Sequence, residues 1–172
     1  PRAYPLHIAA KLLSDGQSSR IYRRLVYEDQ LAVSAFGAGH IIEDPNLFYA
    51  VSIVQPGRTP EESEAALIGE FDRLKTELIS DQELQRAKNQ FARDYIFTRL
   101  TVEQKASHLS HAAVIHSDIT TADAEFDIFM GITKEDVRRV ARTYFNEENR
   151  LVLTILPPAS AGRSFLRPGG DQ

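Results

Sequence analysis

The spacing of apolar residues changes along the chain, and each change predicts the boundary of a helix or a strand. Residues 6–13 are almost continuously apolar, which favours a short buried helix, and Gly16 is suited to end it in a left-handed conformation. A second helix is predicted to begin at Ser18 or Ser19, where a serine can serve as the N-cap. Its apolar face comprises Ile21, Tyr22, Leu25 and Val26, and the side chains expected to face water are Arg20, Arg23 and Arg24.

From Leu31 the apolar period falls to two, which predicts a β-hairpin. Residues 43–46, Glu-Asp-Pro-Asn, have the chemistry of a turn, and the strand predicted over residues 47–54 is apolar on both faces. Gly37 and Gly39 lie in the first strand, where a glycine marks either a bulge or a close approach of another backbone. The sequence favours the bulge.

Helix signals dominate the rest of the chain. Capping residues begin three further helices, at Thr59, Ser80 and Thr133. The stretch that starts at Ser80 is long for one helix, so we expect a bend near residues 100–102. A short helix should end at Gly131. The expected apolar faces are Ala65, Ile68, Phe71, Leu74 and Leu78, then Leu84, Ala87, Phe91 and Tyr95, then Leu109, Ala112 and Ile115, then Phe126, Phe129 and Met130, and last Val137, Val140 and Tyr144.

Residues 151–156 are predicted as a final strand. The order of helices, hairpin, helices and strand predicts an α+β fold, in which helices pack on one face of an antiparallel-rich sheet. Residues 1–157 are expected to form this domain. Residues 158–172, which are rich in proline, glycine and serine, are expected to form a flexible tail.

Composition narrows the class of function. The chain has 172 residues, 42% of them hydrophobic, which is enough for a well-packed domain. Its 20 basic and 24 acidic residues give a net charge of −4, so it lacks the positive field that a nucleic-acid partner requires. No apolar run approaches the roughly 20 residues of a membrane span. The absence of cysteine excludes disulfides and thiolate metal sites but leaves the compartment unknown, with bacterial periplasm and cytoplasm both open.

Candidate residues for catalysis or metal binding are few. The five histidines are His7, His40, His108, His111 and His116. The pair His108 and His111 has a spacing that can chelate a metal on one helix, but only Glu103 or Asp118 offers a third ligand, and the sequence favours a solvated or helix-capping pair. No motif supports Ser/His/Asp catalysis, and Ser18-Ser19 is better explained as an N-cap.

Four segments nevertheless resemble one known family in their order and spacing. The segments are "LLSDGQSSRIYRRLVYEDQLAVSAF", "DPNLFYAVSIVQPGRTPEESEAAL", "SDQELQRAKNQFARDYIF" and "ITKEDVRRVARTYFNEENRLVLTILPP". Over about residues 5–158 the chain resembles the C-terminal domain of the pitrilysin/insulinase-type zinc peptidases, the family that also includes the subunits of mitochondrial processing peptidase.

The resemblance implies a division of labour between two domains. In that family two homologous halves close like a clamshell around an unfolded peptide, and only the N-terminal half holds zinc, through an inverted H-x-x-E-H motif. This chain lacks the motif. It therefore resembles the non-catalytic half, which would need no cofactor of its own and would pair with a zinc-bearing half in the same polypeptide or in a partner subunit. The chain alone is predicted to be inactive.

The resemblance also locates a substrate grip that this chain has lost. Many active relatives hold the peptide with an arginine and, seven residues later, a tyrosine, and the matching positions here are Val26 and Val33. Arg23 or Arg24 could supply a guanidinium from the neighbouring turn, but a helix turns by about 100° per residue, so a position two residues away lies on another face, and the role is not carried over to them. We therefore assign no catalytic, substrate-binding or metal-binding residue to this chain.

Three functions follow from this reading. The preferred one is the non-catalytic domain of a zinc metallopeptidase, which forms part of the peptide chamber and meets an unfolded peptide through its backbone and through apolar contacts. The second is a core-like structural or assembly subunit that keeps the fold and cuts nothing, and the loss of both grip positions favours it. The third is an unrelated α+β interaction module.

Overall fold

The computed structural model describes residues 4–39 and 47–156. The predicted turn at residues 43–46 and the predicted tail at residues 158–172 lie outside this part. The elements are α1 (Tyr4–Ser14), α2 (Arg20–Tyr22), the π-helical turn η1 (Arg23–Glu28), β1 (Ala32–Gly39), β2 (Phe48–Val54), α3 (Pro60–Thr76), α4 (Asp81–Phe97), α5 (Val102–His116), α6 (Thr121–Met130), α7 (Lys134–Tyr144) and the 3-10 turn η2 (Glu147–Asn149).

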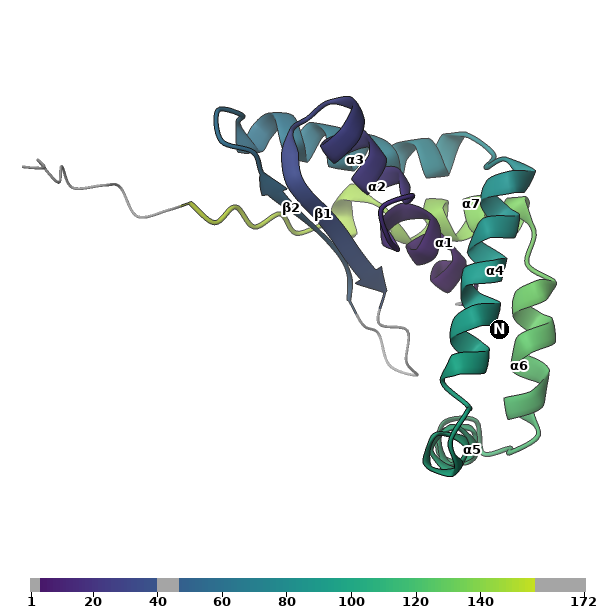
Figure 1. The fold of residues 1–172 in the computed structure, drawn as a ribbon. Coiled ribbons are helices and arrows are strands. Elements are labelled where there is room, and N and C mark those ends of the chain that lie inside the picture. The colour runs from purple at the N-terminus through teal and green to yellow at the C-terminus, as the bar shows by residue number, and fades with distance from the viewer. Residues whose placement is uncertain (1–3, 40–46, 157–172) are drawn as a thin grey trace, which may run out of the picture.

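The hairpin and the helices α1, α2, α3 and α7 make up the main body, and an arm of α4, α6 and α5 extends from it (Figure 1). β1 and β2 pair antiparallel, with α1 packed against β1 and α3 against β2. The predicted α+β class is confirmed. In the part of the chain that the structure describes, no helix has the length and apolarity needed to cross a lipid bilayer.

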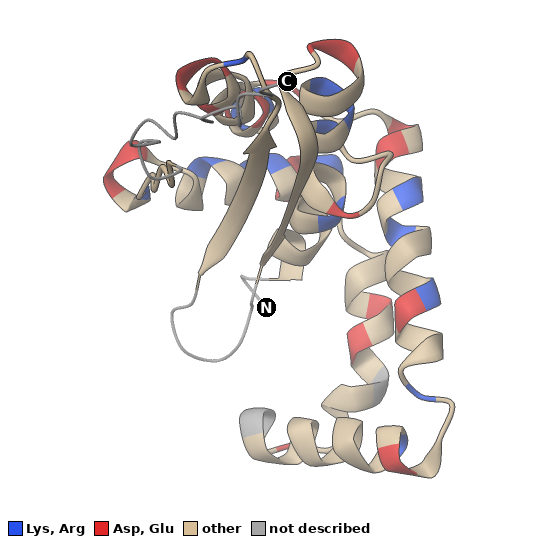
Figure 2. Ribbon diagram, turned by 60° about the vertical axis from the view of Figure 1, so that its left-hand side comes forward, with Lys and Arg blue, Asp and Glu red and all other residues tan. Residues whose placement is uncertain are grey.

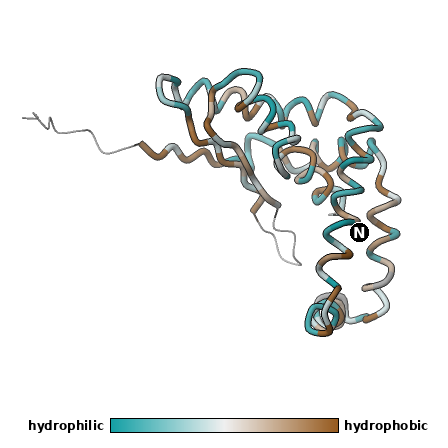
Figure 3. Tube along the Cα trace, in the orientation of Figure 1, coloured by the Kyte–Doolittle hydropathy of each residue, from teal (hydrophilic) through white to brown (hydrophobic). Residues whose placement is uncertain are grey.

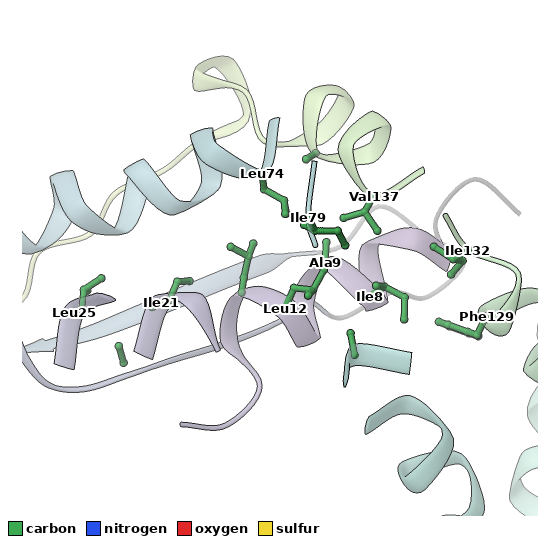
Figure 4. Packing of buried hydrophobic residues seen from close by; sticks show 14 of the residues in the cluster. Ile8, Ala9, Leu12, Ile21, Leu25, Leu74, Ile79, Phe129, Ile132 and Val137 are labelled. Carbon is green, nitrogen blue, oxygen red and sulfur yellow. The ribbon is translucent and has the colours of Figure 1, made fainter. Parts of the chain in front are cut away.

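The core is built around α1. Its side chains Ile8, Ala9, Leu12 and Leu13 are all 0% exposed, as expected from the continuous apolar run. They pack against buried residues from many other parts of the chain, including Ile21, Leu25, Leu74, Ile79, Phe129, Ile132 and Val137 (Figure 4). Gly16 follows the helix with φ +78°, so its predicted left-handed conformation is confirmed.

Gly37 and Gly39 mark a close approach of chain segments and not the predicted bulge. A Cβ added at Gly37 would collide with the carbonyl oxygen of Tyr49 and would lie 3.2 Å from the Cβ of Ser14. The only register shift in the β1–β2 ladder lies between Ala32 and Ser34, near the start of β1. Glycine is therefore needed at position 37 because α1 and β2 both come close to that side of β1.

The predicted strand over residues 151–156 is wrong, because these residues join no ladder and the described sheet contains only β1 and β2. The segment is nevertheless apolar and exposed, with Leu151 92% and Ile155 85% accessible. A strand requires a neighbour for its backbone N–H and C=O groups, and the described residues supply none here. The sequence pattern shows that the segment is apolar but does not show whether a neighbouring strand is present to pair with it.

Three predicted helix faces, those of α3, α5 and α7, are partly wrong. In α5 the expected core residue Leu109 is 41% exposed. In α3 the expected core residue Leu78 comes after the helix ends and is 44% exposed, Ala65 is exposed, and Tyr144 of α7 is 43% exposed. Polar side chains take part of the buried face of α3 instead. Ser63 lies with its Oγ 2.6 Å from the Oγ of Ser52, and the buried carboxylate of Glu70 accepts a hydrogen bond from the guanidinium of Arg73. A prediction that places only apolar residues in the core misses buried polar residues such as Ser63 and Glu70.

The predicted capping boxes and the predicted bend are confirmed. Thr59, Ser80 and Thr133 each exchange hydrogen bonds with the residue three positions later. The bend is a complete break, because α4 ends at Phe97 and α5 begins at Val102 after a further capping box, Thr101 with Gln104.

Arg20 does not face water as predicted. Its Nε donates to Oε1 of Glu83 at 2.8 Å, and the arginine side chain is only 10% exposed. The ion pair joins α2 to the first turn of α4. Burial acts to raise the pKa of Glu83, but hydrogen bonds from Arg20 and Ser80 outweigh it and hold the pKa at about 2.

This pair predicts a specific loss of stability in acid. Because the pKa of Glu83 in the folded state, about 2, lies below its ordinary value of 4.5, the stabilisation from its ion pair is present above pH 4.5 and is lost as the pH falls toward 2. We expect Glu83→Gln to be less stable than the parent at pH 7 and to approach it near pH 2.5, as measured by urea unfolding. The control is Glu62→Gln, which alters an equivalent but fully exposed capping box. Equal pH profiles for the two variants would contradict the role given to Arg20.

Candidate functional site

The histidines are dispersed over the structure. His7 lies in α1 against the ring of Phe129, with ring centroids 5.4 Å apart. Burial, with a smaller effect of the Lys11 ammonium, lowers the pKa of His7 to about 4, so the ring is neutral at pH 7. His40 and the side chain of His116 lie outside the described residues. Within those described, no group of three or more His, Cys, Asp or Glu side chains is placed to hold a metal ion.

His108 packs in the joint between α4, α5 and α6, and the prediction that it is solvated or caps a helix end is wrong. Both nitrogens of its ring lie within 2.9 Å of Nη2 of Arg99, which also donates to Glu125 at 3.0 Å. The guanidinium of Arg99 stacks 3.3 Å above the ring of Tyr95. His111 is on the exposed side of α5. The two imidazoles therefore do not form a chelating pair.

The other candidate residues have local roles. Glu103 is exposed in the first turn of α5, and Asp118 accepts a hydrogen bond from the backbone N–H of Thr120 at 2.9 Å. Ser19 occupies the predicted N-cap position of α2, although its hydroxyl makes no capping hydrogen bond. None of these arrangements resembles a nucleophile with an adjacent base.

The two positions that match the lost substrate grip fall in irregular backbone. Val26 lies in η1, a π-helical turn, and is half-buried against the core. Val33 lies at the register shift of β1 and is 53% exposed. Such irregularities occur often at functional sites, where they change the direction of a side chain. Arg23 and Arg24 are exposed and pair locally with Glu28 and Asp29 at 3.3 and 2.6 Å.

Val33 belongs to an exposed apolar surface on the side of the hairpin away from the helices. We call this surface the open face and define it as Val33, Phe36, Val51 and Ile53, which are 53%, 44%, 37% and 49% exposed. Phe36 lies directly opposite Val51 in the ladder, and Ile53 lies two residues further along β2. Figure 3 shows apolar residues along both strands.

The open face carries no charge. Neither β1 nor β2 contains a charged residue, and both strands are uniformly tan in Figure 2. Among the described residues that flank the strands in sequence, Arg24 pairs with Asp29, and Arg58 donates to the carbonyl oxygens of Asp29 and Gln30 at 3.5 and 3.3 Å. The surface can therefore bind apolar side chains, while the strand edges, which carry no lysine or proline, can bind a peptide backbone.

No site residue was predicted from the sequence, and the open face was not foreseen. The available signal was the absence of charge from both strands of the hairpin, combined with apolar residues on both faces of the second strand. A half-exposed strand normally alternates apolar with polar residues, so two apolar faces indicate that both sides make contacts.

Comparison with known proteins gives a consistent result. The family model described as "Peptidase M16 inactive domain" matches residues 1–91. Among curated proteins, the zinc protease PqqE of Helicobacter pylori is 24% identical over 152 residues, which are 88% of this chain and 34% of that protein. The chain thus spans about a third of the length of this relative.

Solved structures have the same fold. A protease from Helicobacter pylori, 24% identical, superimposes with a TM-score of 0.77 over 86% of this chain and 36% of that one. A protein assigned as a zinc protease from Bordetella pertussis, 26% identical, gives 0.76 over 92% of this chain and 86% of that one. The inactive peptidase domain of a protein assigned as a zinc protease from Bordetella parapertussis, also 26% identical, gives 0.80 over 94% and 87%.

Proposed function

The chain belongs to the inactive-domain family of the M16 peptidases, and from this membership we propose that it is the non-catalytic half of a zinc metallopeptidase. In this proposal it forms part of the wall of a peptide-binding chamber. It pairs with a zinc-bearing half that carries the inverted H-x-x-E-H motif, either in the same polypeptide or in a partner subunit.

The observation that carries the proposal is the structural match to an inactive peptidase domain, with a TM-score of 0.80, in a chain that has no H-x-x-E-H motif. The residues present do not fit a catalytic zinc ion, which needs three protein ligands and an open position for water. Among the described residues no such group of ligands comes together. We therefore assign the zinc to the other half and give no residue of this chain a part in activating water.

The part left for this chain is to contact the peptide. Val26 and Val33 offer no polar group where many active relatives have an arginine and a tyrosine, so a charged grip is not expected. Contacts would come from the open face and from backbone hydrogen bonds at a strand edge, which bind an extended peptide independently of most of its side chains.

A second candidate is a structural subunit that assembles with other chains and cuts nothing. The observation that favours it is the replacement of both grip positions by valine. In that case the open face would be covered by a partner subunit instead of a peptide.

Reconstitution distinguishes the two functions. We expect hydrolysis of an unstructured peptide to be several-fold faster when this chain is mixed with its zinc-bearing half than for either component alone. As a control, Arg23→Ala and Arg24→Ala should leave KM nearly unchanged, because both arginines pair locally. A stable complex that never cleaves would support the structural subunit. A tenfold rise in KM for the arginine variants, equivalent to about 1.4 kcal/mol, would show that they do hold the peptide.

A further inference from the structure

The open face has a repeat that matches an extended peptide. On one face of a strand, side chains recur every two residues, about 6.5–7 Å apart, which is also the spacing of alternate side chains in an extended peptide. Val51 and Ile53 have this spacing on β2, and Phe36 stands opposite Val51 on β1. All three are at least 37% exposed, so their apolar surface is available for contact.

The lack of charge limits what can bind there. A charged side chain placed over the open face would lose hydration and would find no counter-charge on β1 or β2, since neither strand contains a charged residue. An apolar side chain in the same place would remove apolar surface from water on both partners. The face is therefore complementary to apolar and not to charged side chains.

The backbone of the hairpin suits an extended partner. Among the described residues β1 and β2 form a two-stranded antiparallel ladder, and neither strand contains a lysine or a proline, which commonly protect a sheet edge from pairing. An edge of this kind binds an extended chain through backbone hydrogen bonds.

We infer that the open face binds an extended segment of the substrate in which apolar side chains alternate with small polar ones, with Phe36 and Val51 at its centre. This inference rests on the proposed function and deepens it by naming the class of peptide. The enzyme assembled on this chain would then prefer such segments over charged ones, although the scissile bond is held by the other half.

The first test measures binding to this chain alone, which does not depend on zinc or turnover. The probes are two fluorescent peptides of equal length, one alternating valine with serine and one alternating lysine with serine. We expect the valine peptide to bind at least tenfold more tightly. Phe36→Lys should weaken its binding about tenfold, whereas Phe97→Lys should not change it, since Phe97 is a comparably exposed phenylalanine (61%) at the end of α4. Equal affinities for both peptides, or equal effects of both variants, would overturn the inference.

Two further readouts keep the test decisive. If circular dichroism shows that Phe36→Lys does not fold, Val51→Ser is used in its place. A smaller polar side chain at an exposed strand position disturbs the core less. Sedimentation of the free chain detects self-association, and a dimer that Phe36→Lys or Val51→Ser dissociates would show that a second copy covers the face and would overturn the inference.

The reconstituted assembly separates failure of the inference from failure of the proposed function. Cleavage of both peptides with the same KM, unaffected by Phe36→Lys, would leave the proposed function standing and remove the inference. The opposite outcome is an assembly that cleaves neither peptide while the chain alone binds the valine peptide tightly. That result would remove the proposed function and leave the peptide preference of the open face standing.

Discussion

Leu12→Ala is expected to lower the free energy of unfolding by about 2–5 kcal/mol. Leu12 is 0% exposed in α1, and α1 contacts β1, α4, α6 and α7, so a cavity there removes contacts from several elements at once. Denaturant unfolding measures the loss. The matched control is Leu109→Ala on α5, where the side chain is 41% exposed and the expected change is within about 1 kcal/mol. Equal losses at the two positions would mean that α1 is not the centre of the core.

Gly37→Ala should destabilise the protein by about 1–3 kcal/mol, because the added methyl group has no free space. It would meet the carbonyl oxygen of Tyr49, which is backbone of the paired strand and cannot move without disturbing the ladder. The same change at Gly69 should have the opposite sign. Gly69 lies inside α3 with nothing within 4 Å of an added Cβ, so alanine there should stabilise the helix by about 0.5–1 kcal/mol.

These two glycine substitutions are best compared in one set of unfolding measurements. Stabilisation by Gly37→Ala, or a loss at Gly69 as large as the loss at Gly37, would contradict the close packing of α1, β1 and β2. Such a result would also weaken the position assigned to the open face, because the opposite side of the same hairpin is held by this packing.

Local signals in the sequence were sufficient to predict the starts of α3, α4 and α7 and the hairpin. A capping box such as Thr59 with Glu62 involves residues three apart, so its hydrogen bonds can be inferred before anything is known of the tertiary structure. The continuous apolar run before Gly16 likewise identified the buried helix. These features depend on neighbours in the chain and not on distant contacts.

Features that depend on distant partners were missed. The partner of Arg20 is Glu83, which is 63 residues away, so the arginine was expected to face water. Gly37 is required by the approach of Tyr49 and Ser14, neither of which is adjacent in sequence. The segment 151–156 was expected to be a strand, but the described residues contain no strand beside it. In each case the sequence shows one side of a contact.

The candidate site shows the same division. The resemblance correctly identified the family, because it uses positions along the chain, whereas its matching of Val26 and Val33 to the grip positions stays a prediction. The open face was not foreseen, because it arises when Phe36 and Val51 from two strands are brought opposite each other. Its exposure follows from the one-sided placement of the helices, which the sequence did predict, but the residues that form the exposed side were not identified.

The central claim, that this chain is the half that does not catalyse, is tested most directly by the metal content and peptidase activity of the purified chain alone. The protein is loaded with zinc, dialysed and assayed by metal analysis, and its hydrolysis of an unstructured peptide is measured with and without chelator. The account predicts well under one zinc per chain and no turnover that the chelator abolishes. One zinc per chain retained through dialysis, with turnover that the chelator stops, would contradict it.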